Sequence, residues 1–453
     1  MKKIALITLL VMLVTMVFAG CGNNTASDVK EVVIWTNQSH SKSAFTNLVM
    51  DFNETIGKAK GIKVVYEVKE GDIGTGVEVA LASNSAPDIF TGVALNKADD
   101  GILMAIEDCE GGAELLKEYE ENFSYVGKWK GKTYTLPYSV TPRGLIYNKD
   151  MFVKAGLVDE NGEAKPPVTW KEVREYAKIL TDAESKEYGI CFPLKWSTWF
   201  VSDILSPGSA SNGLVTGYEP VSGKYDYAPY KPMMEAIMGI KADESYFPGA
   251  EGLDNDPARA RFADGKIGMK FGFSWDVGVL NDQFPASCDW GVAPYPVVDE
   301  NEKYQQIMSV NALYYMNKKN AEEQDKAAEI FEVYKWLHSD EVITELYNNC
   351  FDLPPVTSKI IEETGKVQKK GWKEFCDLLD ISYAQIPTMP SDITGKESLK
   401  DLFINKVWTG DMSIDEAIAT ANKNMNDGIE EYFKLNTEDS RDAYIMKEWN
   451  IKR

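Results

Sequence analysis

Hydrophobic positions in the first part of the chain alternate between the period of strands and the period of helices. Residues 31–36 (EVVIWT) and 62–68 (IKVVYEV) are apolar, β-branched runs of strand length. Between them, apolar side chains recur at helical spacing over 41–56, which predicts a helix. A further helix is expected at 77–82 and a third strand at 88–91. Because strand and helix alternate, we predict an α/β layer with parallel strands.

The rest of the chain continues as short strands between helices. Thr169 begins a predicted helix, and Glu172 completes the pattern of a capping box. Residues 195–230 are rich in Trp, Ser, Gly and Pro with weak periodicity, which indicates a surface-forming insertion of loops and short helices. Strands are expected at 132–136, 144–147, 189–192, 266–271, 289–294 and 310–316, with helices at 149–155, at 257–262 and over most of the chain after 321.

The N-terminal segment differs from everything that follows. Two lysines precede an apolar run at 4–18, and two small residues separate this run from Cys21. This pattern is typical of a secretory signal peptide, and the run is shorter than the ~20 apolar residues of a membrane-spanning helix. The sequence FAGC at 18–21 also resembles a bacterial lipobox, although that motif prefers Leu in place of Phe18. We therefore predict a signal peptide at 1–20, then a lipidated Cys21 and tether at 21–30. A plain signal peptide with an unmodified cysteine is the alternative.

Composition and charge narrow the classes of function. The 453 residues predict two or more domains. Against 48 Lys and Arg stand 70 Asp and Glu, a net charge of −22 that repels phosphate backbones, so no nucleic-acid partner is expected. Two histidines are few for a metalloenzyme, and no GxSxG, HExxH, P-loop or CxxC pattern is present. The sequence is also compatible with the pair of catalytic carboxylates of a glycosidase, because acidic residues are abundant.

Several short motifs follow one another along the chain. They are PDIF at 87–90, GKTYTLP at 131–137, LIYNKD at 145–150, PVTWKE at 167–172, FADGKIGM at 262–269 with SW at 274–275, and GDMSIDEA at 410–417. Each motif is weak alone. In this order they resemble the extracellular solute-binding proteins of ATP-driven importers, specifically the sugar-binding group that includes maltose-binding protein.

This resemblance implies a periplasmic-binding-protein-like fold, with two discontinuous α/β lobes, a hinge and a ligand cleft between the lobes. Crossings between the lobes are expected near 139–144, near 305–311 and after Asp352. The first lobe would then comprise 31–138 plus 308–352. The second would comprise 139–307 plus 353–453.

The resemblance also implies a function. The family has no catalytic activity of its own, so we expect no enzyme, no cofactor and no metal. We predict a monomeric, lipid-anchored protein on the extracytoplasmic face of the membrane, delivering a carbohydrate, in particular an oligosaccharide, to the permease subunits of an ABC importer. An anchored carbohydrate-active enzyme and a same-family binder of a non-sugar such as a polyamine remain alternatives.

Aromatic residues are the first candidates for a sugar site, because flat rings suit the apolar C–H faces of a sugar. Trp275 follows a predicted strand where family members place a stacking aromatic, although it could also be a core residue. Asp276 could accept sugar hydroxyls or cap the next helix. Trp196 and Trp199 lie in the polar insertion, where they could stack on a sugar or form a local core.

Residues after the first and third predicted strands are further candidates, because ligands bind beyond the carboxyl ends of strands in doubly wound sheets. Asn37, Ser39 and His40 lie in the loop after the first strand, where some could instead cap the next helix. Thr91 and Gly92 end the third strand, where backbone groups can approach a ligand closely.

Candidates also lie on the expected crossings. Thr141 and Arg143 are on the first, and the guanidinium could bind a pair of hydroxyls or an acidic sugar, or pair with a carboxylate. Asp352 precedes Leu-Pro-Pro at the third, where it could also be a surface-turn residue. A polyamine would need several carboxylates, and Asp276 with Asp352 is the available pair. Tyr314-Tyr315 resembles the tandem tyrosines that iron-binding relatives use as metal ligands. Because adjacent side chains of a strand face opposite ways, both rings could not easily bind one ion, so we expect no iron site.

Overall fold

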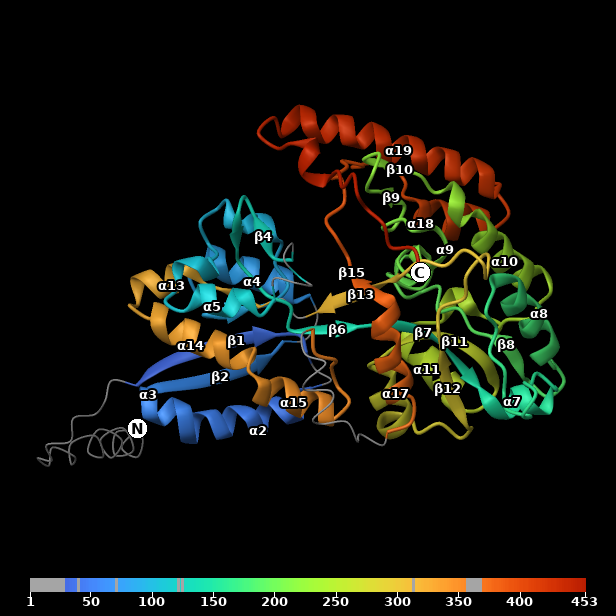
Figure 1. Cartoon of the computed structure of the whole chain (residues 1–453), viewed down its shortest axis with the longest axis horizontal. Coiled ribbons are helices and arrows are strands. Elements are labelled where there is room, and N and C mark those ends of the chain that lie inside the picture. Colours follow the sequence, from blue (N-terminus) through green and yellow to red (C-terminus); the bar gives the residue numbers. More distant parts are fainter. Residues whose placement is uncertain are drawn as a thin grey trace, which may run out of the picture.

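The computed structural model describes residues 29–38, 41–69, 72–119, 123, 126–311, 314–355 and 369–453. The predicted signal peptide, Cys21, Ser39 and His40 lie outside these ranges. Figure 1 shows two lobes side by side along the long axis, with a narrow group of strands between them. The two-lobe α/β fold is therefore confirmed.

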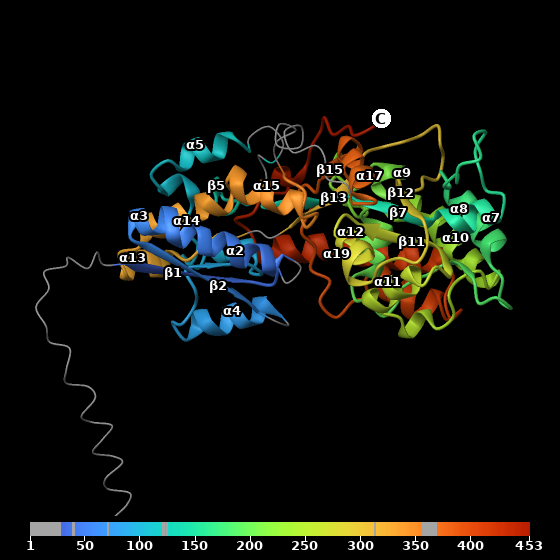
Figure 2. The same cartoon turned by 90° about the horizontal axis from the view of Figure 1, so that it is seen from below.

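The first lobe is built on a four-stranded sheet with the order β14-β3-β1-β2. Strands β1 (Lys30–Thr36), β2 (Ile62–Val68) and β3 (Ile89–Phe90) are parallel, and β14 (Tyr315–Met316) runs antiparallel to β3. Figure 2 shows α2, α14 and α15 on one face of this sheet and α4 on the other. The helices of this lobe are α2 (Lys42–Phe52), α3 (Lys58–Lys60), α4 (Ile73–Ala82), α5 (Gly112–Lys117), α13 (Lys318–Glu323), α14 (Ala327–Leu337) and α15 (Asp340–Asn348).

The second lobe has a mixed four-stranded sheet with the order β12-β7-β11-β8. Its strands are β7 (Arg143–Asn148), β8 (Tyr188–Ile190), β11 (Ile267–Phe273) and β12 (Trp290–Ala293). Strand β7 is antiparallel to β11 and β12, whereas β11 is parallel to β8. Every residue of β7 and β11 is buried, so both faces of the sheet are covered at these two strands.

Helices and short strands complete the second lobe. The helices are α7 (Lys149–Lys154), α8 (Trp170–Leu180), α9 (Ser209–Asn212), α10 (Lys231–Ala242), α11 (Asn255–Ala263), α12 (Asp276–Gly278), α17 (Trp372–Asp377), α18 (Leu399–Leu402) and α19 (Ile414–Leu435). Two hairpins, β4 (Lys128–Trp129) with β5 (Lys132–Thr133) in the first lobe and β9 (Tyr218–Glu219) with β10 (Lys224–Tyr225) in the second, are antiparallel. Single 3₁₀ or π turns occur at 53–57, 95–98, 106–108, 201–205, 228–230, 250–252, 279–283, 378–381, 403–407 and 441–444.

A three-stranded sheet lies between the lobes (Figure 1). Strand β6 (Ser139–Thr141) pairs antiparallel with β13 (Gln306–Asn311), which pairs parallel with β15 (Ser382–Ala384). Val140 also forms a bridge with Leu353. The segments expected to cross between the lobes thus lie side by side, while the exact division of the chain remains a prediction.

The sequence predicted most elements, with some corrections. Thr169 and Glu172 form the expected capping box at the start of α8. The strand expected over 310–316 is wrong, because β13 ends at Asn311 and β14 begins only at Tyr315. The insertion at 195–230 does consist of short elements, but it is not surface-forming. Its large side chains pack into the core of the second lobe, among them Trp199, Tyr218, Tyr225 and Tyr230.

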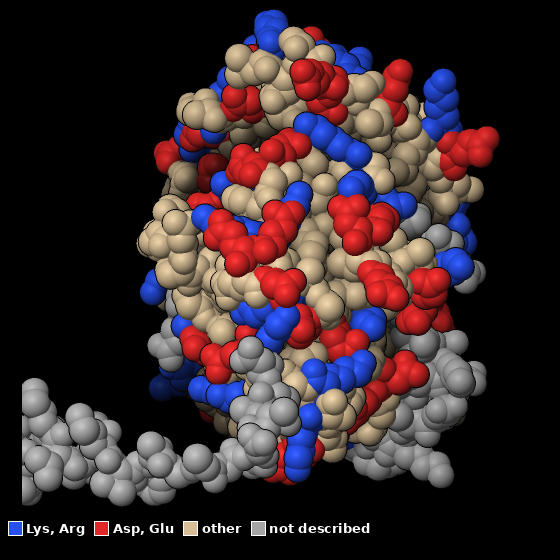
Figure 3. Space-filling view, turned by 90° about the vertical axis from the view of Figure 1, so that its left-hand side faces the viewer, with Lys and Arg blue, Asp and Glu red and all other residues tan. Residues whose placement is uncertain are grey.

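Charged side chains of both signs are interspersed on the end face of the first lobe (Figure 3). Ion pairs such as Lys60 with Glu332, 2.6 Å apart, and Lys30 with Glu329, 3.1 Å apart, join segments that are distant in sequence. Such partly exposed pairs contribute little to stability, about 0–1 kcal/mol each. Among the described residues, no helix combines the length and apolarity that a membrane span requires.

Candidate ligand-binding site

Three aromatic rings at the end of β11 form a continuous surface, here called the aromatic shelf: Trp196, Phe273 and Trp275. The rings of Phe273 and Trp275 are stacked, with centroids 4.5 Å apart and an interplanar angle of 26°. Trp196 meets Phe273 edge-on, with a centroid distance of 5.9 Å. Phe273 is 2% exposed, whereas both tryptophans are half-buried. A buried ring thus supports two rings that keep part of their surface in contact with solvent.

Arg143 connects the shelf to the sheet between the lobes. Because β7 pairs with β11, Arg143 lies directly opposite Phe273, and its guanidinium carbon is 5.1 Å from the Phe273 ring centroid. Nη1 donates to the Ile307 carbonyl at 2.9 Å and Nη2 to the Ser309 hydroxyl at 2.6 Å, both on β13. Burial lowers the pKa of this guanidinium to about 10, so the group stays charged near neutral pH. The shelf is therefore tied to the strand that runs between the lobes.

Asp276 holds the turn that carries Trp275. Its side chain is fully buried, and one carboxylate oxygen accepts from Arg259 Nε at 2.5 Å while the other accepts from the Phe273 amide at 2.8 Å. Lys270 Nζ lies 3.6 Å from the second oxygen. Burial alone raises the pKa of Asp276, but the charges of Arg259 and Lys270 outweigh it and keep that pKa below its ordinary value. Both oxygens serve the protein itself, so Asp276 positions the shelf.

Trp199 is separated from Trp196, although only two residues lie between their positions in the insertion. Its indole is fully buried and packs against Phe192, Phe200 and Phe403, with centroid distances of 5.7, 6.0 and 6.5 Å. This placement in the core leaves no exposed ring face for a ligand. Sequence could not separate the two tryptophans, because only the packing of the insertion decides which one turns outward.

The candidates of the first lobe lie at one edge of its sheet. Asn37 is exposed just after β1, and Thr91 and Gly92 follow β3, which is the neighbour of β1. Thr91 is 3% exposed. Gly92 has a φ of 89°, and a Cβ there would lie 2.6 Å from Ile73 Cγ2, so this turn packs directly on the start of α4. The structure therefore brings the ends of the first and third strands to the same edge of the sheet.

Buried polar groups surround the inter-lobe strands. Thr141 on β6 is 1% exposed and lies opposite Ser309, and Asp352 is 5% exposed. The negative charge of Asp352 adds to burial, the larger effect, in raising the pKa of Tyr314 to about 12. Tyr138 contacts Tyr314 edge-on, at a centroid distance of 5.4 Å. This tyrosine pair beside Asp352 was not recognised from the sequence, because its members are far apart along the chain.

The tandem tyrosines contact different parts of the first lobe. Tyr314 packs on Tyr138, whereas the ring centroid of Tyr315 lies 6.4 Å from that of Phe90. Their side chains therefore diverge, although Tyr314 precedes the strand that begins at Tyr315. Across the described ranges, no group of His, Cys, Asp and Glu side chains has an arrangement that could hold a metal ion.

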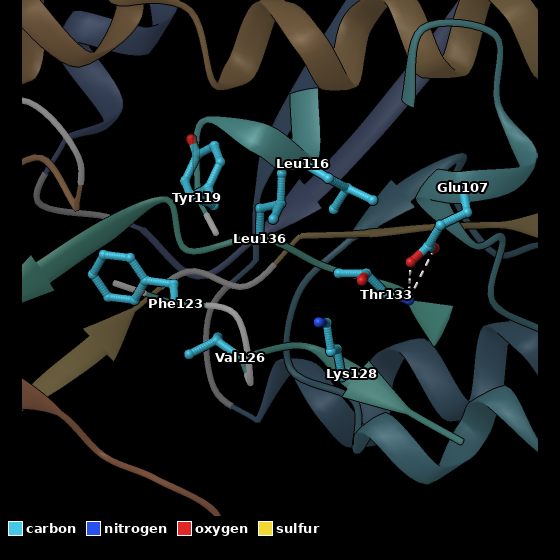
Figure 4. Close-up of a pocket in the computed structure, with 8 residues that line it drawn as sticks. All are labelled: Glu107, Leu116, Tyr119, Phe123, Val126, Lys128, Thr133 and Leu136. Carbon is cyan, nitrogen blue, oxygen red and sulfur yellow. Dashed lines mark hydrogen bonds between the residues drawn. The ribbon is translucent and has the colours of Figure 1, made fainter. Parts of the chain in front are cut away.

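A separate cavity of about 130 Å³ lies in the first lobe (Figure 4). The Glu107 carboxylate accepts from the Thr133 amide at this cavity, with both oxygens 2.9 Å from the nitrogen. Its lining comprises Glu107, Leu116, Tyr119, Phe123, Val126, Lys128, Thr133 and Leu136. None of these residues belongs to the shelf, so this cavity is distinct from the aromatic site.

The sequence missed Phe273 and Asp203. Phe273 lies beyond the strand predicted at 266–271, although it continues the alternation of that strand. Asp203 lies in a π-helical turn within the insertion, and it is 4% exposed. Because the sequence predicted a surface segment here, nothing indicated that this carboxylate is buried. Only the fold could reveal its burial.

The fold and the aromatic site define a two-lobed binding-protein architecture. Residues 38–343 match the family described as bacterial extracellular solute-binding protein, and the chain belongs to this family. The maltotriose-binding protein of Pyrococcus abyssi is 26% identical over 293 residues, covering 63% of this chain and 57% of that protein. An sn-glycerol-3-phosphate-binding periplasmic protein of Brucella melitensis is 26% identical over 354 residues, covering 74% and 77% respectively.

Solved structures share the fold at low sequence identity. The GacH receptor of Streptomyces glaucescens matches with a TM-score of 0.67 and 19% identity, over 90% of this chain and 99% of that chain. The maltose/maltodextrin-binding domain of Bdellovibrio bacteriovorus, bound to maltotriose, matches with a TM-score of 0.65 and 17% identity, over 89% and 100%. At this level of identity, the two structures show the fold that they share with this chain. They do not identify the ligand that this chain binds.

Proposed function

We propose that this protein captures a carbohydrate, in particular an oligosaccharide, outside the cytoplasmic membrane and delivers it to an ABC importer. The observation that carries the proposal is the aromatic shelf, two half-buried tryptophans supported by Phe273 next to a fixed guanidinium. Flat rings bind the C–H faces of sugar rings, and polar groups around them bind the hydroxyls. Membership of the solute-binding family supports a binding role rather than catalysis.

Similar proteins support a sugar but also name a second ligand class. The names of one relative and several structural neighbours include maltotriose, cycloalternan and acarbose. Other relatives are described as binding sn-glycerol 3-phosphate. Arg143, the cation beside the shelf, already donates from Nη1 to Ile307 and from Nη2 to Ser309, while its buried Nε has no partner among the described residues. Because two of its three nitrogens already bind β13, this guanidinium favours a neutral ligand over a phosphate ester.

A thermal-shift panel tests the ligand class. It contains maltotriose, raffinose, glucose, sn-glycerol 3-phosphate and spermidine, each titrated against the mature protein. We expect an oligosaccharide to raise the melting temperature, because a ligand at a hundred times its Kd stabilises the folded state by about 2.7 kcal/mol. Chromatography of the incubated sugars provides the control for catalysis. A shift with only glycerol phosphate or spermidine, or release of hydrolysis products, would contradict the proposal.

We also propose that Cys21 carries the lipid that holds the protein at the membrane. Its support is the signal-peptide pattern and the lipobox-like run at 18–21. With Cys21→Ser, we expect the protein to appear in the soluble fraction or to remain unprocessed, since the acylated thiol is lost. Fractionation with mass spectrometry of the mature N-terminus measures both. Membrane retention of a correctly cleaved Cys21→Ser protein would show that another feature anchors it.

A further inference from the structure

The cavity of the first lobe has a polar side and an apolar side (Figure 4). The apolar side is formed by Leu116, Tyr119, Phe123, Val126 and Leu136. Of these, Tyr119, Phe123 and Leu136 are each 2% exposed, so this side lies inside the lobe. The polar side is formed by Glu107, Lys128 and Thr133, and the first two of these are exposed. The cavity therefore leads from the surface into the apolar interior.

The hairpin of β4 and β5 brings the polar side chains together. Lys128 lies directly opposite Thr133 in the register of the hairpin. Opposite residues of an antiparallel pair share one face, with Cβ atoms about 4.5–5.5 Å apart. Figure 4 shows both side chains directed into the same space. Because both oxygens of Glu107 lie 2.9 Å from the Thr133 amide nitrogen, that carboxylate is held at the same side of the cavity.

Two groups on the polar side have no partner among the described residues. Thr133 is 2% exposed, and its buried Oγ1 makes no hydrogen bond there. Lys130 and Lys132 of the same hairpin each form an ion pair with an aspartate, with N–O distances of 2.9 and 2.6 Å, whereas Lys128 forms none within the described ranges. Buried polar groups normally have a partner, so an unpartnered hydroxyl beside an unpaired ammonium indicates a place for a ligand.

The charges and the volume of the cavity select a ligand chemistry. The Lys128 ammonium and the Thr133 hydroxyl can both donate to a carboxylate. Glu107 can accept from an ammonium as well as from the Thr133 amide, because a carboxylate has about four lone-pair sites. A simple anion is repelled by Glu107 and a simple cation by Lys128, whereas a molecule that carries both charges pairs with each. An apolar cavity of about 150 Å³ binds benzene, so the 130 Å³ here suits an apolar part of a few carbon atoms.

We propose that this cavity is a second ligand site, which binds a small apolar α-amino acid of the size of valine or leucine. The carboxylate of the amino acid accepts from Lys128 Nζ and Thr133 Oγ1, and its ammonium donates to Glu107. Its aliphatic side chain packs on the apolar side of the cavity. All lining residues belong to the first lobe and none to the aromatic shelf, so the site is independent of the proposed carbohydrate site.

Titration of the mature protein with L-leucine and L-valine, followed by ligand-observed NMR and calorimetry, tests the site. We expect saturable binding of at least one of them. Two analogues of leucine carry a single charge each: 4-methylpentanoate lacks the ammonium, and 3-methylbutylamine lacks the carboxylate. Each loses a charge-assisted hydrogen bond and should bind at least about tenfold more weakly than leucine. Absence of binding by both amino acids, or an analogue that binds as tightly as leucine, would overturn the proposal.

Variants of the polar side locate the binding. Lys128→Met removes an exposed charge and should fold like the wild type, yet bind leucine about tenfold more weakly. Thr133→Val removes the unpartnered hydroxyl, so we expect an unchanged or higher melting temperature together with weaker leucine binding.

Lys130→Met is the matched control, because it removes the same charge from the same hairpin at a residue that does not line the cavity. We expect it to leave leucine affinity unchanged. An equal loss in Lys128→Met and Lys130→Met would show a general effect of charge and would overturn the proposal, as would unchanged leucine affinity in both Lys128→Met and Thr133→Val. The sugar affinity of all three variants should equal that of the wild type, because the aromatic shelf is not altered.

Discussion

Asp276→Ala is expected to lower the free energy of unfolding by about 3–5 kcal/mol, because it leaves the buried charges of Arg259 and Lys270 uncompensated. The carboxylate is fully buried, and the side chains of Arg259 and Lys270 are 12% and 3% exposed. The Phe273 amide also loses its acceptor. Urea unfolding monitored by tryptophan fluorescence measures the change, and Asp276→Asn should lose nearly as much, since it removes the same charge.

Asp256→Asn is the matched control for this prediction. Asp256 binds the same Arg259, 2.7 Å from Nη1, but its own side chain is 67% exposed. Solvent screens this pair, so we expect a loss of less than about 1 kcal/mol. If Asp276→Asn also lowered the free energy of unfolding by less than about 1 kcal/mol, the buried ion network would not be what stabilises the end of β11.

Trp275→Ala is expected to weaken carbohydrate binding at least about tenfold, because truncating an aromatic anchor at a buried contact costs about 2 kcal/mol or more. The ring keeps part of its surface exposed while Phe273 supports its other face. Trp275→Phe should lose less affinity, since a smaller flat ring remains. Calorimetric titration with the sugar found in the panel measures both variants.

Trp408→Ala separates packing from contact. Trp408 is 3% exposed, lies in the core of the same lobe and donates to Glu251 at 2.7 Å. We expect it to lower the melting temperature strongly, as large-to-small core changes do, without changing affinity in the folded protein. Should Trp275→Ala behave like Trp408→Ala, with a lower melting temperature and unchanged affinity, Trp275 would be a packing residue and Trp196 would become the leading candidate.

Local signals account for the parts of the fold that were predicted. The capping box at Thr169 and Glu172 involves residues three apart, so the sequence shows both partners at once. Strands β1 and β2 are long enough for their apolar runs to stand out. The break between β13 and β14 was missed, because a continuous apolar run does not reveal where its pairing partner changes from β6 to β3.

The sequence by itself determined the alternation of strands and helices and the family, and it predicted Trp275 as a ligand-binding candidate. It did so because periodicity, caps and ordered motifs are properties of neighbouring residues. Only the tertiary structure assembled the shelf, since Trp196 comes from the insertion, Phe273 from β11 and the opposing Arg143 from β7. It also placed Trp199 in the core and buried Asp203. Burial and pairing depend on contacts between residues distant along the chain, and a linear pattern does not contain those contacts.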